Sequence, residues 1–138
     1  MICLDANVWI YFLDKDLAEH DAVRPDVEGV LAGETVFTTT VLQMEVVHYL
    51  SNQLAESEPV IDRFLALEDV TTAQLTEADV GAASDLLADH EHTGIGGRDA
   101  TVVTAMERYD VSRLWTHDDG LGRLGDELDW LTVTDPVE

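Results

Sequence analysis

Residues 1–13 read MICLDANVWIYFL and contain the transition on which the fold depends. Residues 1–4 are apolar and predict a short buried strand. Residues 6–13 predict a helix, because Trp9, Ile10 and Leu13 fall on one helical face. Asp5 stands between the two. A strand that passes at once into a helix is typical of an α/β fold, and the rest of the chain repeats this pattern.

Strands and helices alternate through most of the remaining sequence. Further strands are predicted at residues 35–38, 70–72, 113–116 and 131–133, and helices at residues 16–31, 41–54, 59–67, 76–90 and 99–109. Thr40 is placed to cap the helix at 41–54, and residues 94–97 predict a loop. The alternation predicts one domain over residues 1–138, an α/β sandwich around a mainly parallel sheet. Ligands of such sheets collect at the carboxyl ends of the strands.

The chain is strongly acidic. It has 7 basic and 29 acidic residues, a net charge of −22, and Lys15 as its single lysine. Such a charge normally argues against a nucleic-acid partner, because phosphate contacts need Lys and Arg. Disorder is disfavoured by the hydrophobic content of 46%. We therefore expect a haloarchaeal protein with a surface adapted to molar salt, where screening removes the objection to a nucleic acid.

The sequence shows no sign of export or of membrane attachment. No apolar run approaches the roughly 18 residues of a membrane span. The first residues carry no basic charge and reach Asp5 at once, which is unlike a signal peptide. Cys3 is the only cysteine, so an internal disulfide is excluded. We expect a cytoplasmic protein.

Asp5 and Glu45 are the first two candidate site residues. Asp5 follows an apolar strand, where it can also serve as the N-cap of the next helix, worth about 1 kcal/mol; Asn7 could serve the same turn. Glu45 shares a helix face with the side chains three and four residues away, of which most are apolar or aromatic: Val41, Leu42, His48 and Tyr49. A carboxylate there is costly unless a cation meets it, and no Lys or Arg stands at helical spacing. Alternatively, Glu45 lies at a solvent-exposed edge of the helix and needs no cation.

Asp99 and Asp118 complete the set of candidate acids. Asp99 precedes Val102, Val103 and Met106 on a predicted buried stripe, although an N-cap would explain it too. Asp118 and Asp119 follow the strand predicted at 113–116, where an Asp-Gly turn is the ordinary explanation.

Several converging carboxylates would raise one another's pKa values, and a divalent cation would remove that cost. Oxygen ligands favour Mg²⁺ or Mn²⁺ over zinc. The histidines show no zinc-binding pattern: His90 and His92 are the closest pair and lack partners at useful spacing, so we interpret them as surface residues.

Four motifs in order resemble those of the PIN domain family. They are Leu4-Asp5-Ala6-Asn7-Val8, the segment from Thr40 to Glu45 and its two following valines, Gly97-Arg98-Asp99 with its Ala-rich helix, and Thr116-His117-Asp118-Asp119-Gly120-Leu121. Leu121 stands where an aromatic residue is common in the family, and the loop at 94–97 is unusually rich in glycine. The resemblance covers nearly the whole chain, and single-domain proteins of this length are similar to VapC-type toxins.

The resemblance implies a three-layer α/β/α fold and an endoribonuclease that depends on Mg²⁺ or Mn²⁺. It implies catalytic roles for Asp5, Glu45, Asp99 and Asp118, with the three aspartates as metal ligands. It also implies supporting roles for Asn7, Thr116 and Asp119, an RNA substrate, a cognate antitoxin protein and a homodimer. In that chemistry one or two metal ions would activate a water for attack on phosphorus. Arg98 could contact RNA phosphate or form an ion pair.

Two other functions remain open from the sequence. An aspartyl-phosphate phosphotransferase or phosphatase also begins with an Asp at a strand end, but such enzymes need a second Asp two residues later or a late lysine. Asn7 occupies the first position, and no lysine follows Lys15. A non-catalytic interaction module of the same fold is the second alternative, and the complete set of acids argues against it.

Overall fold

The computed structural model describes residues 1–138 and contains a single five-stranded sheet with helices on both faces. The strands are β1 (Ile2–Leu4), β2 (Val36–Thr39), β3 (Val70–Ala73), β4 (Arg113–Trp115) and β5 (Thr132–Thr134). The helices are α1 (Ala6–Leu13), α2 (His20–Gly33), α3 (Thr40–Gln53), α4 (Ser57–Leu65), α5 (Glu77–Asp89), α6 (Gly97–Arg108) and α7 (Asp119–Glu127), with a short 3₁₀ helix, η1 (Glu91–Thr93).

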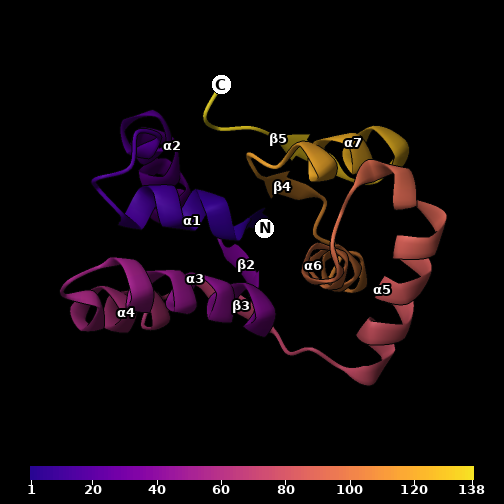
Figure 1. Cartoon of the computed structure of the whole chain (residues 1–138), viewed down its shortest axis with the longest axis horizontal. Helices are drawn as coiled ribbons and strands as arrows, with labels where there is room; N and C mark the ends of the chain where they lie inside the picture. The colour runs from indigo at the N-terminus through magenta and orange to yellow at the C-terminus, as the bar shows by residue number, and fades with distance from the viewer.

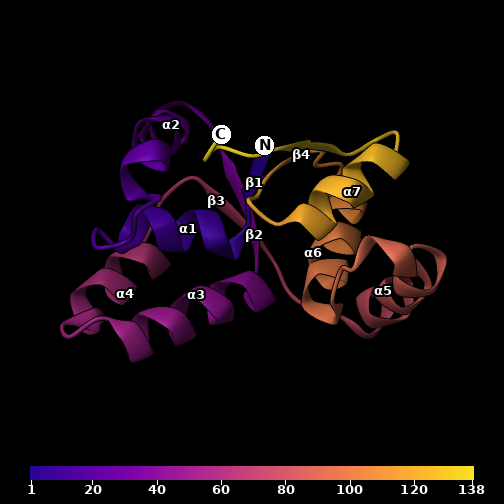
Figure 2. The same ribbon diagram turned by 45° about the horizontal axis from the view of Figure 1, so that its top comes forward.

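The sheet is wholly parallel, with the strand order β3-β2-β1-β4-β5. Helices α1 to α4 lie on one side of it and α5 to α7 on the other, as Figures 1 and 2 show. The three-layer α/β/α architecture is therefore confirmed. No helix is both long enough and apolar enough to cross a membrane.

Strand β1 occupies the centre of the sheet. Cys3 pairs in register with Phe37 of β2 and also with Leu114 of β4. Ile2, Cys3 and Leu4 are fully buried, as expected for a strand between two neighbours and two helical layers. The chain builds outward from β1 to β2 and β3, and later returns to the other side of β1 to add β4. The carboxyl ends of β1 and β4 thus form the switch point at which parallel sheets bind ligands.

Most predicted elements are present, with shifted ends. The helix expected over residues 16–31 begins later, at His20, because the preceding residues form turns after α1. The cap expected at Thr40 is instead Thr39, whose Oγ1 accepts a 3.0 Å hydrogen bond from the backbone N–H of Leu42. Thr40 Oγ1 accepts from the backbone of Leu75 and so connects α3 to the segment before α5.

Helix α7 is the one α-helix that the sequence does not predict. Its three glycines lower the intrinsic helix propensity by about 1 kcal/mol each. Burial of Leu121 and Leu124 offsets this cost. At Gly125 a Cβ atom would lie 2.6 Å from Cγ2 of Val133, so the glycine allows α7 to pack closely on β5.

Candidate active site

Asp5 lies at the carboxyl end of β1 and is also the N-cap of α1. Its backbone N–H donates to the carbonyl of Trp115 at 2.9 Å, which continues the pairing of β1 with β4. Oδ1 accepts from the N–H of Ala6 at 2.8 Å, and Oδ2 accepts from the hydroxyl of Thr116 at 2.7 Å. The residue is only 6% exposed. Burial raises its pKa, the two hydrogen bonds oppose that rise, and the charges of Glu45 and Asp118 add to it.

Thr116 holds the ends of β1 and β4 together. In addition to its bond to Asp5, its Oγ1 accepts from Nδ2 of Asn7 at 3.3 Å and from the backbone N–H of Asp118 at 3.0 Å. Asn7 completes the link, because its Oδ1 accepts from the backbone N–H of His117. Two of the three predicted supporting residues, Asn7 and Thr116, are therefore hydrogen-bonded within this network.

Asp118 follows β4 and is the N-cap of α7. Its Oδ2 accepts from the N–H of Leu121 at 2.9 Å. A Cβ at Gly120 would lie 3.0 Å from that oxygen and 3.1 Å from the carbonyl of Thr93, so close packing favours glycine here. The Asp-Gly turn expected at residues 119–120 is instead the first turn of α7. Asp119 is exposed in the first turn of α7. The charge of Asp118, and not that of Asp119, raises the pKa values of Asp5 and Asp99.

Glu45 lies on α3 with its side chain 22% exposed. Oε1 is 3.3 Å from Nε of Arg98, which comes from the first turn of α6. The cation that Glu45 lacks at helical spacing is thus supplied by another helix. Burial raises the pKa of Glu45, the charge of Arg98 opposes the rise, and the charge of Asp99 adds to it.

Asp99 lies in the first turn of α6, three residues after the N-cap position at Gly96. It is therefore not the N-cap; its Oδ2 accepts a long bond of 3.5 Å from the N–H of Gly96. The hydrophobic stripe that follows it is buried as predicted: Val102, Val103 and Met106. Burial, and then the charges of Asp5 and Asp118, raise the pKa of Asp99 to about 6.

The four predicted acids form one electrostatic group, although they come from four different elements. Each of Asp5, Glu45 and Asp99 has its pKa raised partly by another member of the set, and Asp118 acts on two of them. No three His, Cys, Asp or Glu side chains are gathered closely enough to hold one ion as they stand. Joint coordination would therefore require side-chain rotations.

His117 is a further residue at this edge that the sequence analysis did not select. Its Nδ1 is 2.7 Å from Oδ2 of Asp135, and its ring packs edge-on against that of Tyr11. The bond to Asp135 raises the pKa of the imidazole. The partner follows β5, so no local pattern in the sequence could have identified this pair.

A family model, the PIN domain, matches residues 2–127. None of the curated proteins matches the chain in sequence at a significant level.

Solved structures resemble the fold over nearly its whole length, each at 16% sequence identity. VapC20 of Mycobacterium tuberculosis, a toxin that cleaves the sarcin-ricin loop, superposes with a TM-score of 0.76 and covers 91% of this chain and 95% of its own. VapBC2 of Rickettsia felis, bound to a DNA fragment of its promoter, has a TM-score of 0.70 with 98% of both chains covered. FitAcB of Neisseria gonorrhoeae has a TM-score of 0.72, with 99% and 98% covered.

Proposed function

The chain belongs to the PIN domain family, and from that premise we propose that it is a metal-dependent endoribonuclease, the toxin of a type II toxin–antitoxin pair. The observation that carries the proposal is the placement of Asp5 and Asp118 at the carboxyl ends of β1 and β4, where their charges raise the pKa of Asp99 and the charge of Glu45 raises that of Asp5. Like charges held together cost stability, and a site that must bind a cation gives a reason to keep them.

The donor atoms fit a hard divalent cation. The four acids offer only carboxylate oxygens, which Mg²⁺ and Mn²⁺ prefer. Asp5, Asp99 and Asp118 would hold the ion, with Glu45 close enough to interact with it. When bound, the ion supplies a Lewis acid that lowers the pKa of a water and stabilises charge on a phosphate.

The surrounding residues keep this set in position. Thr116 and the N–H of Ala6 fix both oxygens of Asp5, so its remaining lone pairs point in defined directions. Asn7 ties α1 to the segment after β4. Arg98 balances the charge of Glu45, and its largely exposed side chain is available to an RNA phosphate as well.

The two alternative functions are less well supported. A nucleophilic Asp5 would attack with an oxygen, but both of its oxygens accept short hydrogen bonds, and Lys15 lies beyond the other end of α1. An interaction module would gain nothing from acids that raise one another's pKa.

A cognate antitoxin is the proposed protein partner, since one of the solved structures of similar fold is a toxin–antitoxin complex from Klebsiella pneumoniae. A groove of about 350 Å³ between α1 and α4 suits such a partner. Lys15 and Arg63 line it, and they are the two basic residues that form no ion pair or hydrogen bond within the chain. Its other walls are apolar: Phe12, Leu13, Val60, Phe64 and Leu67. This chemistry suits an acidic helix with one apolar face.

The remaining parts of the proposal concern the surroundings of the protein. We propose a homodimer in the cytoplasm of a halophilic archaeon, where molar salt screens the charge of −22.

Cleavage of RNA in the presence of Mg²⁺ or Mn²⁺ tests the central proposal. Chain freed of any antitoxin should cut a structured RNA in molar KCl and stop when EDTA is added. The Asp5→Asn variant, purified in parallel, controls for contaminating ribonucleases. Cleavage that persists in EDTA, or that the variant retains, would contradict the proposal.

A further inference from the structure

A hollow of about 360 Å³ adjoins the group of four acids at Glu45, which forms part of its wall. We call it the α3–α6 hollow. Its walls come from the first turns of α3, the segment before α5 and the start of α6: Thr40, Val41, Met44, Glu45, His48, Leu75 and Arg98. The volume lies at the lower end of the range of about 300–1,000 Å³ that is usual for small-molecule sites.

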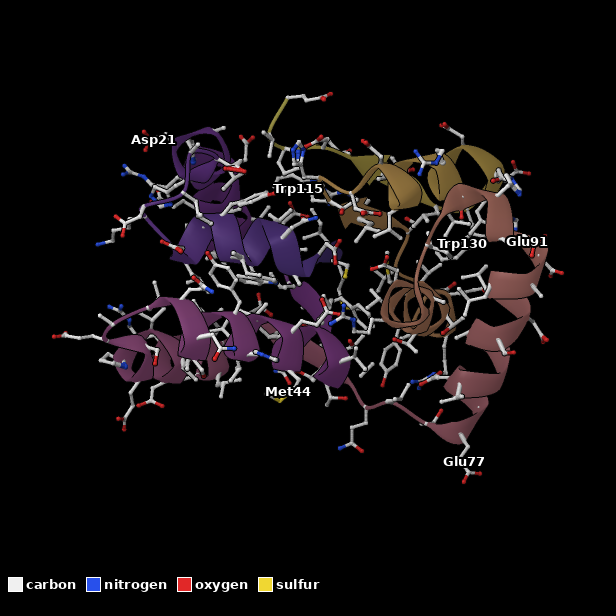
Figure 3. All side chains as sticks on the ribbon, viewed as in Figure 1. Asp21, Met44, Glu77, Glu91, Trp115 and Trp130 are labelled. Carbon is white, nitrogen blue, oxygen red and sulfur yellow. The ribbon has the colours of Figure 1, made fainter.

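The walls combine exposed apolar surface with positive charge. Met44 is 60% exposed and Leu75 is 45% exposed, so two large hydrophobic side chains border the hollow. Met44 points away from the body of α3 in Figure 3. Arg98 stands at the same hollow with its side chain 76% exposed, although it pairs with Glu45. Apolar surface on which a base can be buried, and a guanidinium for its phosphate, are groups that suit an unstacked nucleotide of RNA.

Charge distinguishes this side of the site from the opposite one. A second hollow of about 350 Å³ adjoins Asp118 beyond β4. Its lining includes five carboxylates: Asp118, Asp119, Asp126, Asp135 and Glu138. The α3–α6 hollow has one carboxylate, Glu45, and that one is already paired with Arg98. Arg123 is the one arginine of the β4-side hollow, so five carboxylates outweigh it, whereas Glu45 and Arg98 balance each other on the α3 side. A polyanion that reaches the four acids is therefore repelled less on the α3 side than on the β4 side.

We propose that the α3–α6 hollow binds the nucleobase next to the scissile phosphate, with the base against Met44 and Leu75 and the adjoining phosphate at Arg98. The proposal rests on the ribonuclease function and adds the subsite that sets the position of the cut. Both apolar residues lie outside the acidic group, so their removal weakens substrate binding without altering the reacting groups.

Abasic substrates test the contact directly. With the parent protein, an RNA that lacks the base beside the cut should show a KM about tenfold higher than the intact RNA, at similar kcat, because the base loses apolar burial against Met44 and Leu75. In the Met44→Ala/Leu75→Ala double variant the two RNAs should have the same KM. Leu65→Ala is the matched control, because Leu65 is 52% exposed on α4 and does not line the hollow. If the double variant distinguishes the two RNAs as well as the parent does, the subsite is excluded.

A second measurement does not need cleavage, so it separates failure of the subsite from failure of the ribonuclease proposal. In Mg²⁺ buffer, at least one of the four nucleoside 5′-monophosphates should shift the methyl NMR signals of Met44 and Leu75, whereas ribose 5-phosphate should not. Equal shifts with the sugar phosphate, or none with any nucleotide, would overturn the proposal. Sedimentation of the double variant gives a further test. If the variant no longer dimerises but still distinguishes abasic from intact RNA, the hollow is an interface between copies of the chain and the proposal is overturned.

Discussion

The hydroxyl of Thr116 donates a 2.7 Å hydrogen bond to Oδ2 of Asp5, and so joins the ends of two strands that are more than a hundred residues apart. The same oxygen of Thr116 accepts from Asn7 and from the backbone of Asp118. One side chain therefore positions a proposed metal ligand, a supporting amide and the turn that carries a second ligand. Its removal should affect the whole site.

Replacing Thr116 by Val tests this arrangement. The variant should lose about 1–3 kcal/mol of unfolding free energy at neutral pH, because the buried carboxylate of Asp5 loses a donor. The loss should be smaller at acid pH than at neutral pH, because the pKa of Asp5 is raised and a protonated carboxyl needs that donor less. RNA cleavage should fall strongly. Thr116→Ser keeps the hydroxyl and is the control; chemical denaturation at both pH values measures the effect, and equal stability of the Val and Ser variants would contradict it.

The Asp99→Asn variant tests whether Asp99 is a metal ligand or only stabilises the start of α6. The amide can still accept from Gly96, so the local structure should persist, while the charge is removed. Mg²⁺-dependent cleavage should fall by orders of magnitude. The metal-free protein should be as stable as the parent or more so, because one repelling carboxylate is gone. Full activity in this variant would remove Asp99 from the site.

The raised pKa of Asp99 predicts a pH dependence. The pKa of Asp99 is about 6 in the folded chain, whereas an ordinary aspartate has a pKa of 3.8. The folded state therefore binds a proton at Asp99 more tightly than the unfolded state does. The stabilisation that comes from a protonated Asp99 is fully present below about pH 4 and is lost as the pH rises through 6. Relative to Asp99→Asn, the metal-free parent should lose about 1–2 kcal/mol between pH 4 and pH 7, after allowance for partial exposure to solvent. Parallel denaturation curves would show this, and a constant difference between the two proteins would refute it.

The same substitution at two glycines of α7 tests how this helix packs. Gly125→Ala should destabilise the protein by about 1–3 kcal/mol, because the new Cβ would overlap the branched side chain of Val133. Gly122→Ala meets no atom within 4 Å and should be neutral or stabilising by up to about 1 kcal/mol. Thermal unfolding of both variants measures the difference, and the reverse order would show that α7 does not pack on β5 as described.

The acidic surface predicts a strong dependence on salt. With a charge of −22, the melting temperature should rise from dilute buffer to molar KCl, because the Debye length falls from about 10 Å at 0.1 M to about 3 Å at 1 M. Circular dichroism at increasing KCl concentrations is sufficient. A melting temperature that does not change would remove the argument for a salt-adapted protein.

Local pattern was sufficient for most of the secondary structure. The helix over Ala6–Leu13 agrees with its prediction at both ends, because an acidic cap precedes it and apolar residues repeat along one face. Helix α7 is not predicted, because its glycines lower the helix propensity and the helix is stabilised by packing of Leu121 and Leu124 into the core. The cap of α3 was misplaced by one residue, because Thr39 and Thr40 are both plausible caps and only the backbone decides between them.

The pattern of strands and helices could be predicted from the sequence, and with it the position of Asp5 and Asp118 just after two strands. Periodicity carries that information because neighbouring residues share one local geometry. Which polar groups meet depends on the folded arrangement: Arg98 contacts Glu45 from another helix, Thr116 bonds to Asp5 across the sheet, and Asp119 is exposed to solvent. Electrostatic energy depends on distance and burial in space, and neither follows from separation along the chain.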